Sequence, residues 1–324
     1  MSDGNKKDRG PWKAVRLIVS ACLLVYLFYD IGYADVIAVV SQATLWPIVV
    51  CMLIIFSRRL LVAYRWYALV RTESADVGFA PLFRIVLVSG SLGFFTPGTV
   101  GIELIRVYAL ARLTDLTLAL SSVAVERLTA LLALVGFVLV GLLFAPIDMS
   151  ATIGISLGVM IAGLCLATLS LFAPWLRAFY LALLVGRFLA PLRSRVLQLY
   201  EQLDAFRRQP WLMPQMALLS IGLQLQRVLE TAALTLALGV EVDIAYLLVI
   251  VPLGVVLSLL PISLGGLGLR EAVYVALFGA IGVDAASAFT LSFLHFMLVI
   301  VVVVVPGAVL YASGGLQTGE QSPR

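Results

Sequence analysis

Six long runs of mainly apolar residues constrain this 324-residue chain more than any other feature, because each approaches or exceeds the length that crosses a hydrocarbon core. They cover residues 17–33, 46–61, 128–146, 153–174, 213–238 and 286–311. Hydrophobic residues make up 62% of the chain and charged residues 12%, which excludes a water-soluble globule. We therefore predict an all-α polytopic membrane protein with about six full spans, in a single integral membrane domain over residues 13–312.

Two further apolar stretches, at residues 81–112 and 245–279, are interrupted by proline and glycine. The breaks begin at Pro97 and Pro261, and each proline has a glycine four residues on. Broken backbone is tolerated at membrane depth only where protein or a wet cavity surrounds it, and paired breaks are typical of transport sites. We predict two oppositely oriented re-entrant helical hairpins that are related as an inverted repeat. Thr96 and Thr99 are candidates to cap the second half-helix of the first hairpin.

Basic residues indicate the orientation of the chain. They are concentrated in blocks at residues 6–16, 58–71 and 177–208, which the predicted spans place on one side. The second block includes Arg58, Arg59 and Arg65, which we expect in the loop after the second span. Because positively charged loops stay in the cytoplasm, we predict that both termini are cytoplasmic, as short tails of residues 1–12 and 313–324.

The basic segment 175–210 lies between the fifth and sixth spans. Its apolar residues recur at helical spacing, at Val196, Leu199, Leu203 and Phe206. This pattern predicts a cytoplasmic interfacial helix that contacts the lipid surface. The alternative, an ordinary loop helix packed on the membrane domain, fits the pattern equally well.

Eight charged residues fall at predicted membrane depth, four of each sign: Glu103, Arg106, Glu126, Arg127, Arg227, Glu230, Arg270 and Glu271. An isolated charge at the bilayer centre costs roughly 2.5–3.5 kcal/mol even on the lenient insertion scale, so each needs a partner or a function. Residues three positions apart share a face of a helix. We therefore predict one local ion pair between Glu103 and Arg106 and another between Arg227 and Glu230. Equal numbers of each sign allow a mutually neutralised cluster. The alternative to a binding site is a set of inert ion pairs that fasten a bundle.

Glycines next to the second break suggest an anion site. Gly265, Gly266 and Gly268 permit positive φ and close backbone approach, and the helix that resumes near Leu269 presents unpaired N–H groups.

The lone His295 is more typical of a satisfied buried imidazole than of a proton relay, which is the alternative.

The sequence offers little support for catalysis. One histidine cannot build a histidine-rich metal site, no acidic cluster suits a metal, and no phosphate-binding Gly-x-x-x-x-Gly-Lys loop is present. We therefore expect that the protein is not an enzyme and uses no cofactor. We also expect that it transports its substrate without binding ATP. The basic residues are explained by topology, so nucleic acid is not a predicted partner.

Three motifs together resemble the membrane family typified by the transmembrane region of lysylphosphatidylglycerol synthase. They are Pro97-x-x-x-Gly-x-Glu103-x-x-Arg106, the Glu126-Arg127 pair, and Pro261-Ile-Ser-x-Gly-Gly-x-Gly-x-Arg270-Glu271. The resemblance covers about residues 13–311. It implies a multi-pass protein of the bacterial inner membrane that translocates a lipid or assists an enzyme of lipid or lipid-linked glycan synthesis, including hopanoid-type pathways. Since the sequence ends at Arg324, with no soluble domain after the membrane part, synthesis of lysylphosphatidylglycerol by this chain is not expected.

These features predict a flippase for a lipid with an anionic or polar head group. Arg106, Arg127 and Arg270 would bind the head group, with Arg227 and Glu230 as a supporting pair. The carboxylates of Glu103, Glu126 and Glu271 would hold the arginines, and the hairpins at Pro97 and Pro261 would move around the site. Two alternatives remain open: a non-transporting partner of a lipid- or glycan-modifying enzyme, and a secondary transporter of a small anion. The oligomeric state is open as well.

Overall fold

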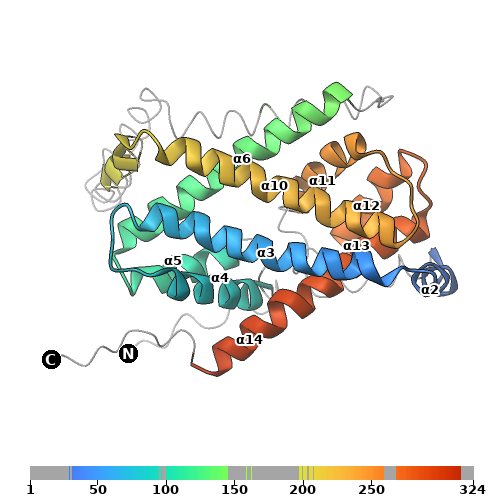
Figure 1. Cartoon of the computed structure of the whole chain (residues 1–324), viewed down its shortest axis with the longest axis horizontal. Coiled ribbons are helices and arrows are strands. Elements are labelled where there is room, and N and C mark those ends of the chain that lie inside the picture. The colour runs from blue at the N-terminus through green and yellow to red at the C-terminus, as the bar shows by residue number, and fades with distance from the viewer. Residues whose placement is uncertain are drawn as a thin grey trace, which may run out of the picture.

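A computed structural model describes residues 31–94, 100–144, 208–258 and 268–314, together with scattered positions that include residue 96 and several between 197 and 206. Every regular element in these ranges is helical (Figure 1). The elements are α2 (Tyr33–Ser41), α3 (Leu45–Val70), α4 (Phe79–Phe94), α5 (Val100–Ala111), α6 (Leu116–Phe144), α10 (Leu212–Ala237), α11 (Ile244–Ser258), α12 (Leu269–Gly279), α13 (Ala285–Val299), the π-helical turn η1 (Ile300–Val304) and α14 (Val305–Ala312). The all-α class is thus confirmed for this part of the chain.

Among the described residues, three helices are long and apolar enough to cross a membrane: Leu45–Val70, Leu116–Phe144 and Ala285–Ala312, the last formed by α13, η1 and α14 together. They contain most of the predicted spans 46–61, 128–146 and 286–311. The predicted span 213–238 is also one helix, α10, but its glutamine and charged residues make it less apolar. Most of the span 17–33 and nearly all of 153–174 lie outside the described residues, so the count of six spans remains a prediction.

Helix α3 corrects one prediction. The helix continues to Val70 instead of ending near residue 61, because neither glycine nor proline follows Pro47 before Gly78 and arginine is a good helix former. Arg58, Arg59 and Arg65 therefore lie inside a helix and not in a loop after the span.

Consecutive helices α4 and α5 lie side by side, on the left of Figure 1. Their approach is close, since a methyl group built on Gly93 would lie 2.9 Å from the Cα of Ile102. The Thr96 hydroxyl donates to the Gly93 carbonyl oxygen at 2.6 Å, at the end of α4. The predicted cap of α5 by Thr96 or Thr99 remains a prediction. Pro97 and Thr99 lie outside the described residues.

Helices α11 and α12 form the second such pair. A methyl group on Gly254 of α11 would lie 3.0 Å from the Tyr274 ring of α12, which shows how closely the two helices pack. Pro261, Gly265 and Gly266 belong to the connection between them, which is outside the described range. The re-entrant character of both pairs and their inverted relation remain predictions.

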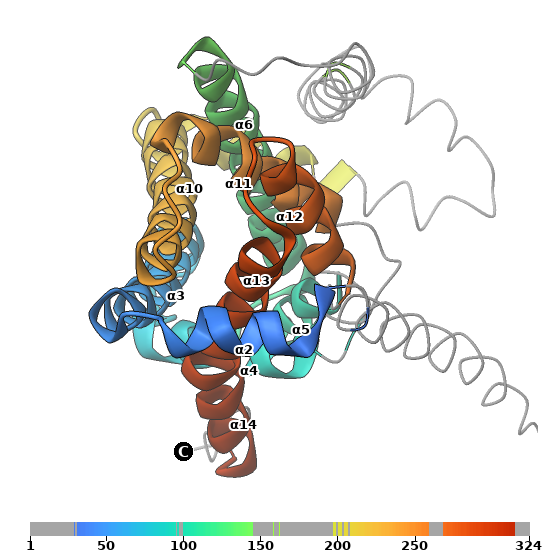
Figure 2. The same cartoon turned by 90° about the vertical axis from the view of Figure 1, so that its right-hand side faces the viewer.

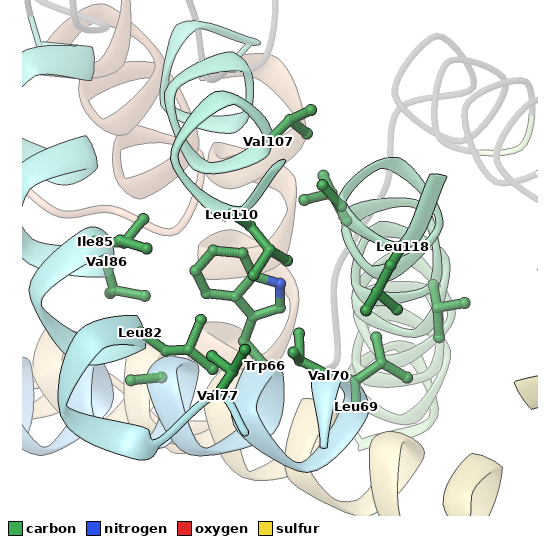
Figure 3. Close-up of a cluster of buried hydrophobic side chains, with 14 of the residues drawn as sticks. Trp66, Leu69, Val70, Val77, Leu82, Ile85, Val86, Val107, Leu110 and Leu118 are labelled. Carbon is green, nitrogen blue, oxygen red and sulfur yellow. The ribbon is translucent and has the colours of Figure 1, made fainter. Parts of the chain in front are cut away.

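The apolar core at the α4–α5 end is built around Trp66 (Figure 3). Its indole is fully buried among side chains of α4, α5 and α6, and its Nε1 donates to Ser122 Oγ at 3.0 Å. Phe206, from the segment 175–210, is fully buried in the same cluster. At this residue the segment packs on the protein, as the loop-helix alternative requires; Val196, Leu199 and Leu203 lie outside the described residues.

Candidate functional site: an arginine-lined cavity

A cavity of about 380 Å³ lies between α3, α5, α6, α10, α11, α12 and α13. Figure 2 shows α3 and α10 on one side of the molecule and α11, α12 and α13 on the other. Three glutamates line the cavity, at Glu103, Glu126 and Glu230. Seven arginines line it as well: Arg58, Arg59, Arg65, Arg106, Arg127, Arg227 and Arg270. The cavity is therefore strongly cationic.

Glu126 of α6 binds two arginines from different helices. Its Oε1 accepts from Arg65 Nε of α3 at 3.2 Å, and its Oε2 is paired with Arg106 of α5. Arg65 also donates to Ser220 Oγ of α10 at 2.8 Å, and the Arg106 guanidinium lies 4.1 Å from the centre of the Trp66 ring. Because both guanidinium groups and the carboxylate are buried, this network joins four helices through charge-assisted hydrogen bonds.

Glu230 of α10 is the second buried acceptor. Its Oε1 accepts from Arg58 Nε at 2.6 Å, and its Oε2 lies 3.1 Å from His295 Nε2. The carboxylate thus connects α10 with α3 and α13. His295 is a satisfied imidazole in this arrangement, and it also lines the cavity.

Glu103 of α5 pairs with Arg127 of α6. This pair is the most exposed of the set, since 38% of the Arg127 side chain and 23% of the Glu103 side chain remain accessible. Its electrostatic contribution is therefore weakened by solvent more than that of the buried pairs.

The start of α12 is occupied by the protein's own carboxylate. Gly268 adopts φ 79°, in the region that favours glycine, and its N–H donates to Glu271 Oε2 at 2.7 Å. Glu271 Oε1 accepts from Arg270 at 2.9 Å, and Arg270 also donates to the Ser292 carbonyl oxygen at 2.8 Å. The positive φ of Gly268 is as predicted, but the helix start holds Glu271 rather than offering a free anion site.

These contacts correct the predicted pairing. Glu103 and Arg106 bond to residues of α6 rather than to each other, and Glu230 bonds to Arg58 rather than to Arg227. Distance along one helix was the wrong criterion, because a carboxylate between packed helices reaches arginines on its neighbours. The equal numbers of the two signs do not extend to the whole described cavity, since α3 adds three arginines to its wall.

Two of the seven arginines in the cavity wall have no ion pair among the residues that the structure describes. They are Arg59 of α3 and Arg227 of α10, both of which line the cavity. Arg59 Nε is buried and has no hydrogen-bond partner in the described part of the chain. These two side chains can therefore bind an external anion without giving up a carboxylate among the described residues.

Sequence reasoning missed Arg58, Arg59 and Arg65 as wall residues. A usable signal was present, since Arg58 and Arg65 are seven residues apart and therefore lie on one face of a helix that nothing interrupts. In the part of the chain searched, no group of three or more histidine, cysteine, aspartate or glutamate residues is arranged to hold a metal ion.

The family model for the lysylphosphatidylglycerol synthase TM region matches residues 13–307, so the chain belongs to this family. No individual curated protein matches the sequence. Family membership, the apolar helices and the charged interior together define an integral membrane protein associated with lipid metabolism.

Proposed function

We propose that this protein moves a lipid with an anionic head group between the two leaflets without using ATP, and that the head group passes through the arginine-lined cavity. The observation that carries the proposal is the excess of arginines over carboxylates in the cavity wall. Ionised side chains at membrane depth are costly, and an unbalanced set of them favours a ligand of opposite charge.

An apolar groove next to the cavity supports a lipid as the ligand. The groove has a volume of about 500 Å³ between α6, α10 and α11, and its lining includes Leu132, Val140, Ile221 and Leu225. Those four side chains are exposed, as expected of a surface that meets acyl chains. We assign the groove to an acyl chain of the same lipid.

Gln224 lines the cavity and directly precedes Leu225, which lines the groove. It is 4% exposed and donates through Nε2 to the Ala130 carbonyl oxygen of α6 at 3.4 Å. Its Oε1 has no hydrogen-bond partner among the described residues. The Gln224 amide thus joins α10 to α6 through one long hydrogen bond and keeps an unused acceptor oxygen. Such a contact could open when a head group enters the cavity.

Movement of the head group requires elements that rearrange. The α4–α5 and α11–α12 pairs are candidates, because each is joined by a connection rich in glycine and proline and each contributes charge to the cavity. Next to them, the π-helical turn η1 interrupts the last long helix, and such turns are frequent at functional sites.

The test is reconstitution of the purified chain alone in vesicles that carry a fluorescent anionic phospholipid. Without translocation, a membrane-impermeant quencher reaches about half of the label; with translocation it reaches nearly all of it. A protein that only positions a partner enzyme would leave the quenched fraction at that of empty vesicles. A small-anion transporter would do the same but would take up a soluble anion. Arg84→Ala, an exposed change on α4 outside the cavity, is the matched control.

A further inference from the structure

We infer that the head group carries more than one negative charge, as a diphosphate or a phosphate monoester does, and that Arg59 and Arg227 bind its phosphate. The inference rests on the proposed function for its lipid. It concerns the same cavity but names the ligand class and two residues that hold it.

The packing of α3 on α10 brings the two arginines to the same level of the cavity. Gln226 Nε2 donates to Ser57 Oγ at 2.9 Å, and a methyl group on Gly222 would lie 3.4 Å from Leu61 Cδ2. Those contacts fix the register of the two helices around Arg59 and Arg227, which both line the cavity. Two like charges that face one cavity in a mainly apolar bundle favour an anion there.

The carboxylates around the cavity are already engaged elsewhere. Glu126 binds two arginines, and Glu230, Glu103 and Glu271 bind one each, which accounts for Arg58, Arg127 and Arg270. None of them is bonded to Arg59 or Arg227 within the described ranges. A buried N–H without an acceptor, such as Arg59 Nε, is costly enough that a ligand oxygen is its natural partner.

Charge selects among phosphates. Seven arginines face the cavity, and with Glu271 behind Arg270 there are four glutamates, so the arginines exceed the carboxylates by three positive charges. A phosphodiester head group offers a single negative charge, whereas a phosphate monoester carries about 1.5 to 2 at neutral pH and a diphosphate carries more. The monoester and diphosphate classes therefore match the cavity better. Planar guanidinium groups also bind phosphate oxygens in pairs, which favours arginine for this role.

The experiment measures binding to the full chain in detergent by isothermal titration calorimetry, in magnesium-free buffer. Inorganic diphosphate, orthophosphate and dimethyl phosphate serve as the probes. We expect inorganic diphosphate to bind at least ~10-fold more tightly than dimethyl phosphate, and Arg59→Gln or Arg227→Gln to weaken diphosphate binding ~10-fold or more. Arg84→Gln is the control, and Arg59→Lys, which keeps the charge, should recover part of the affinity. Equal affinity for diphosphate and dimethyl phosphate would overturn the charge assignment, and unchanged affinity in both glutamine variants would overturn the assignment of the residues.

A second arm separates a lipid from a free phosphate. Farnesyl diphosphate should bind more tightly than inorganic diphosphate if the acyl groove takes part, whereas equal affinities would assign the site to a soluble anion and overturn the lipid part of the inference. Failure here is distinguishable from failure of the proposed function. Lipid exchange without diphosphate selectivity removes only this inference, and selective binding without exchange removes only the translocation.

Discussion

The arginines of the cavity wall fall into two groups that are held in opposite ways. Arg65 and Arg106 share the buried carboxylate of Glu126 and connect four helices. Arg59 and Arg227, on the α3–α10 side, have no carboxylate in the described part of the chain. The first group resembles the interior fastening of a bundle, and the second is available to a ligand.

The contrast separates two reasons for which charge persists at membrane depth. A paired arginine contributes to the fold, so its loss should affect stability first. An unpaired arginine opposes the fold through desolvation and repulsion, so its loss should spare stability and reduce ligand binding. Each variant tests whether a residue contributes mainly to stability or mainly to ligand binding.

The largest effect is expected for Glu126→Gln. The change leaves Arg65 and Arg106 buried without a negative charge, and we expect it to lower the free energy of unfolding by about 3 kcal/mol. Chemical denaturation in detergent micelles, followed by the fluorescence of the tryptophans, measures this loss.

Glu103→Gln is the matched control for that prediction. It also removes one carboxylate from one arginine, but Arg127 and Glu103 are partly exposed, so the loss should be about 1 kcal/mol or less. Equal destabilisation by the two variants would contradict the view that burial distinguishes the pairs.

Arg270→Ala is expected to have the next largest effect. Glu271 would keep the Gly268 N–H and the Ser292 hydroxyl as partners, which limits the loss of stability to about 2 kcal/mol, while lipid exchange should be abolished. The protein should still be recovered from the membrane fraction. Undiminished exchange in proteoliposomes would remove Arg270 from the mechanism and leave it a purely structural role.

Much of the fold follows from the sequence, because apolar length and charge depletion determine which segments become long helices. The predicted segments 46–61, 128–146 and 286–311 lie almost entirely in the three described helices that are long and apolar enough to cross a membrane. Glycine and proline likewise mark where α4 ends before α5 begins, and where α11 ends before α12.

The ion pairs could not be predicted in the same way. Spacing along one helix favoured bonding between Glu103 and Arg106, but side chains in a bundle choose partners on neighbouring helices, and those distances depend on packing that no local pattern records. The end of α3 was the decisive error. Arg58, Arg59 and Arg65 were assigned to a loop by the positive-inside rule, although the uninterrupted helix carries them into the cavity wall.

Arg59→Gln and Arg227→Gln test the unpaired group, and we expect an effect of intermediate size on the rate of lipid exchange. Since neither residue has an ion pair to lose within the described ranges, each change should leave the unfolding midpoint within experimental error or raise it. The rate of lipid exchange should nevertheless fall about 10-fold, equivalent to about 1.4 kcal/mol. Quenching kinetics in proteoliposomes measure the rate, with Arg84→Gln as the control. A lower unfolding midpoint combined with a normal exchange rate would place both residues in the paired group.

The smallest effect is expected for His295→Phe. Glu230 would retain Arg58 at 2.6 Å after losing the imidazole, so the free energy of unfolding should fall by about 1 kcal/mol, the value of one ordinary hydrogen bond. Arg58→Gln, which leaves Glu230 with His295 alone, should lower the free energy of unfolding more than twice as much if the buried ion pair carries most of the contact.

Lipid exchange by the His295 variant should keep the wild-type dependence on pH between about 6 and 8, the range in which an ordinary histidine titrates. A pH dependence that is present in the wild type and absent in the variant would instead make His295 a proton relay, and Glu230 would then belong to the transport mechanism as well as to the fold.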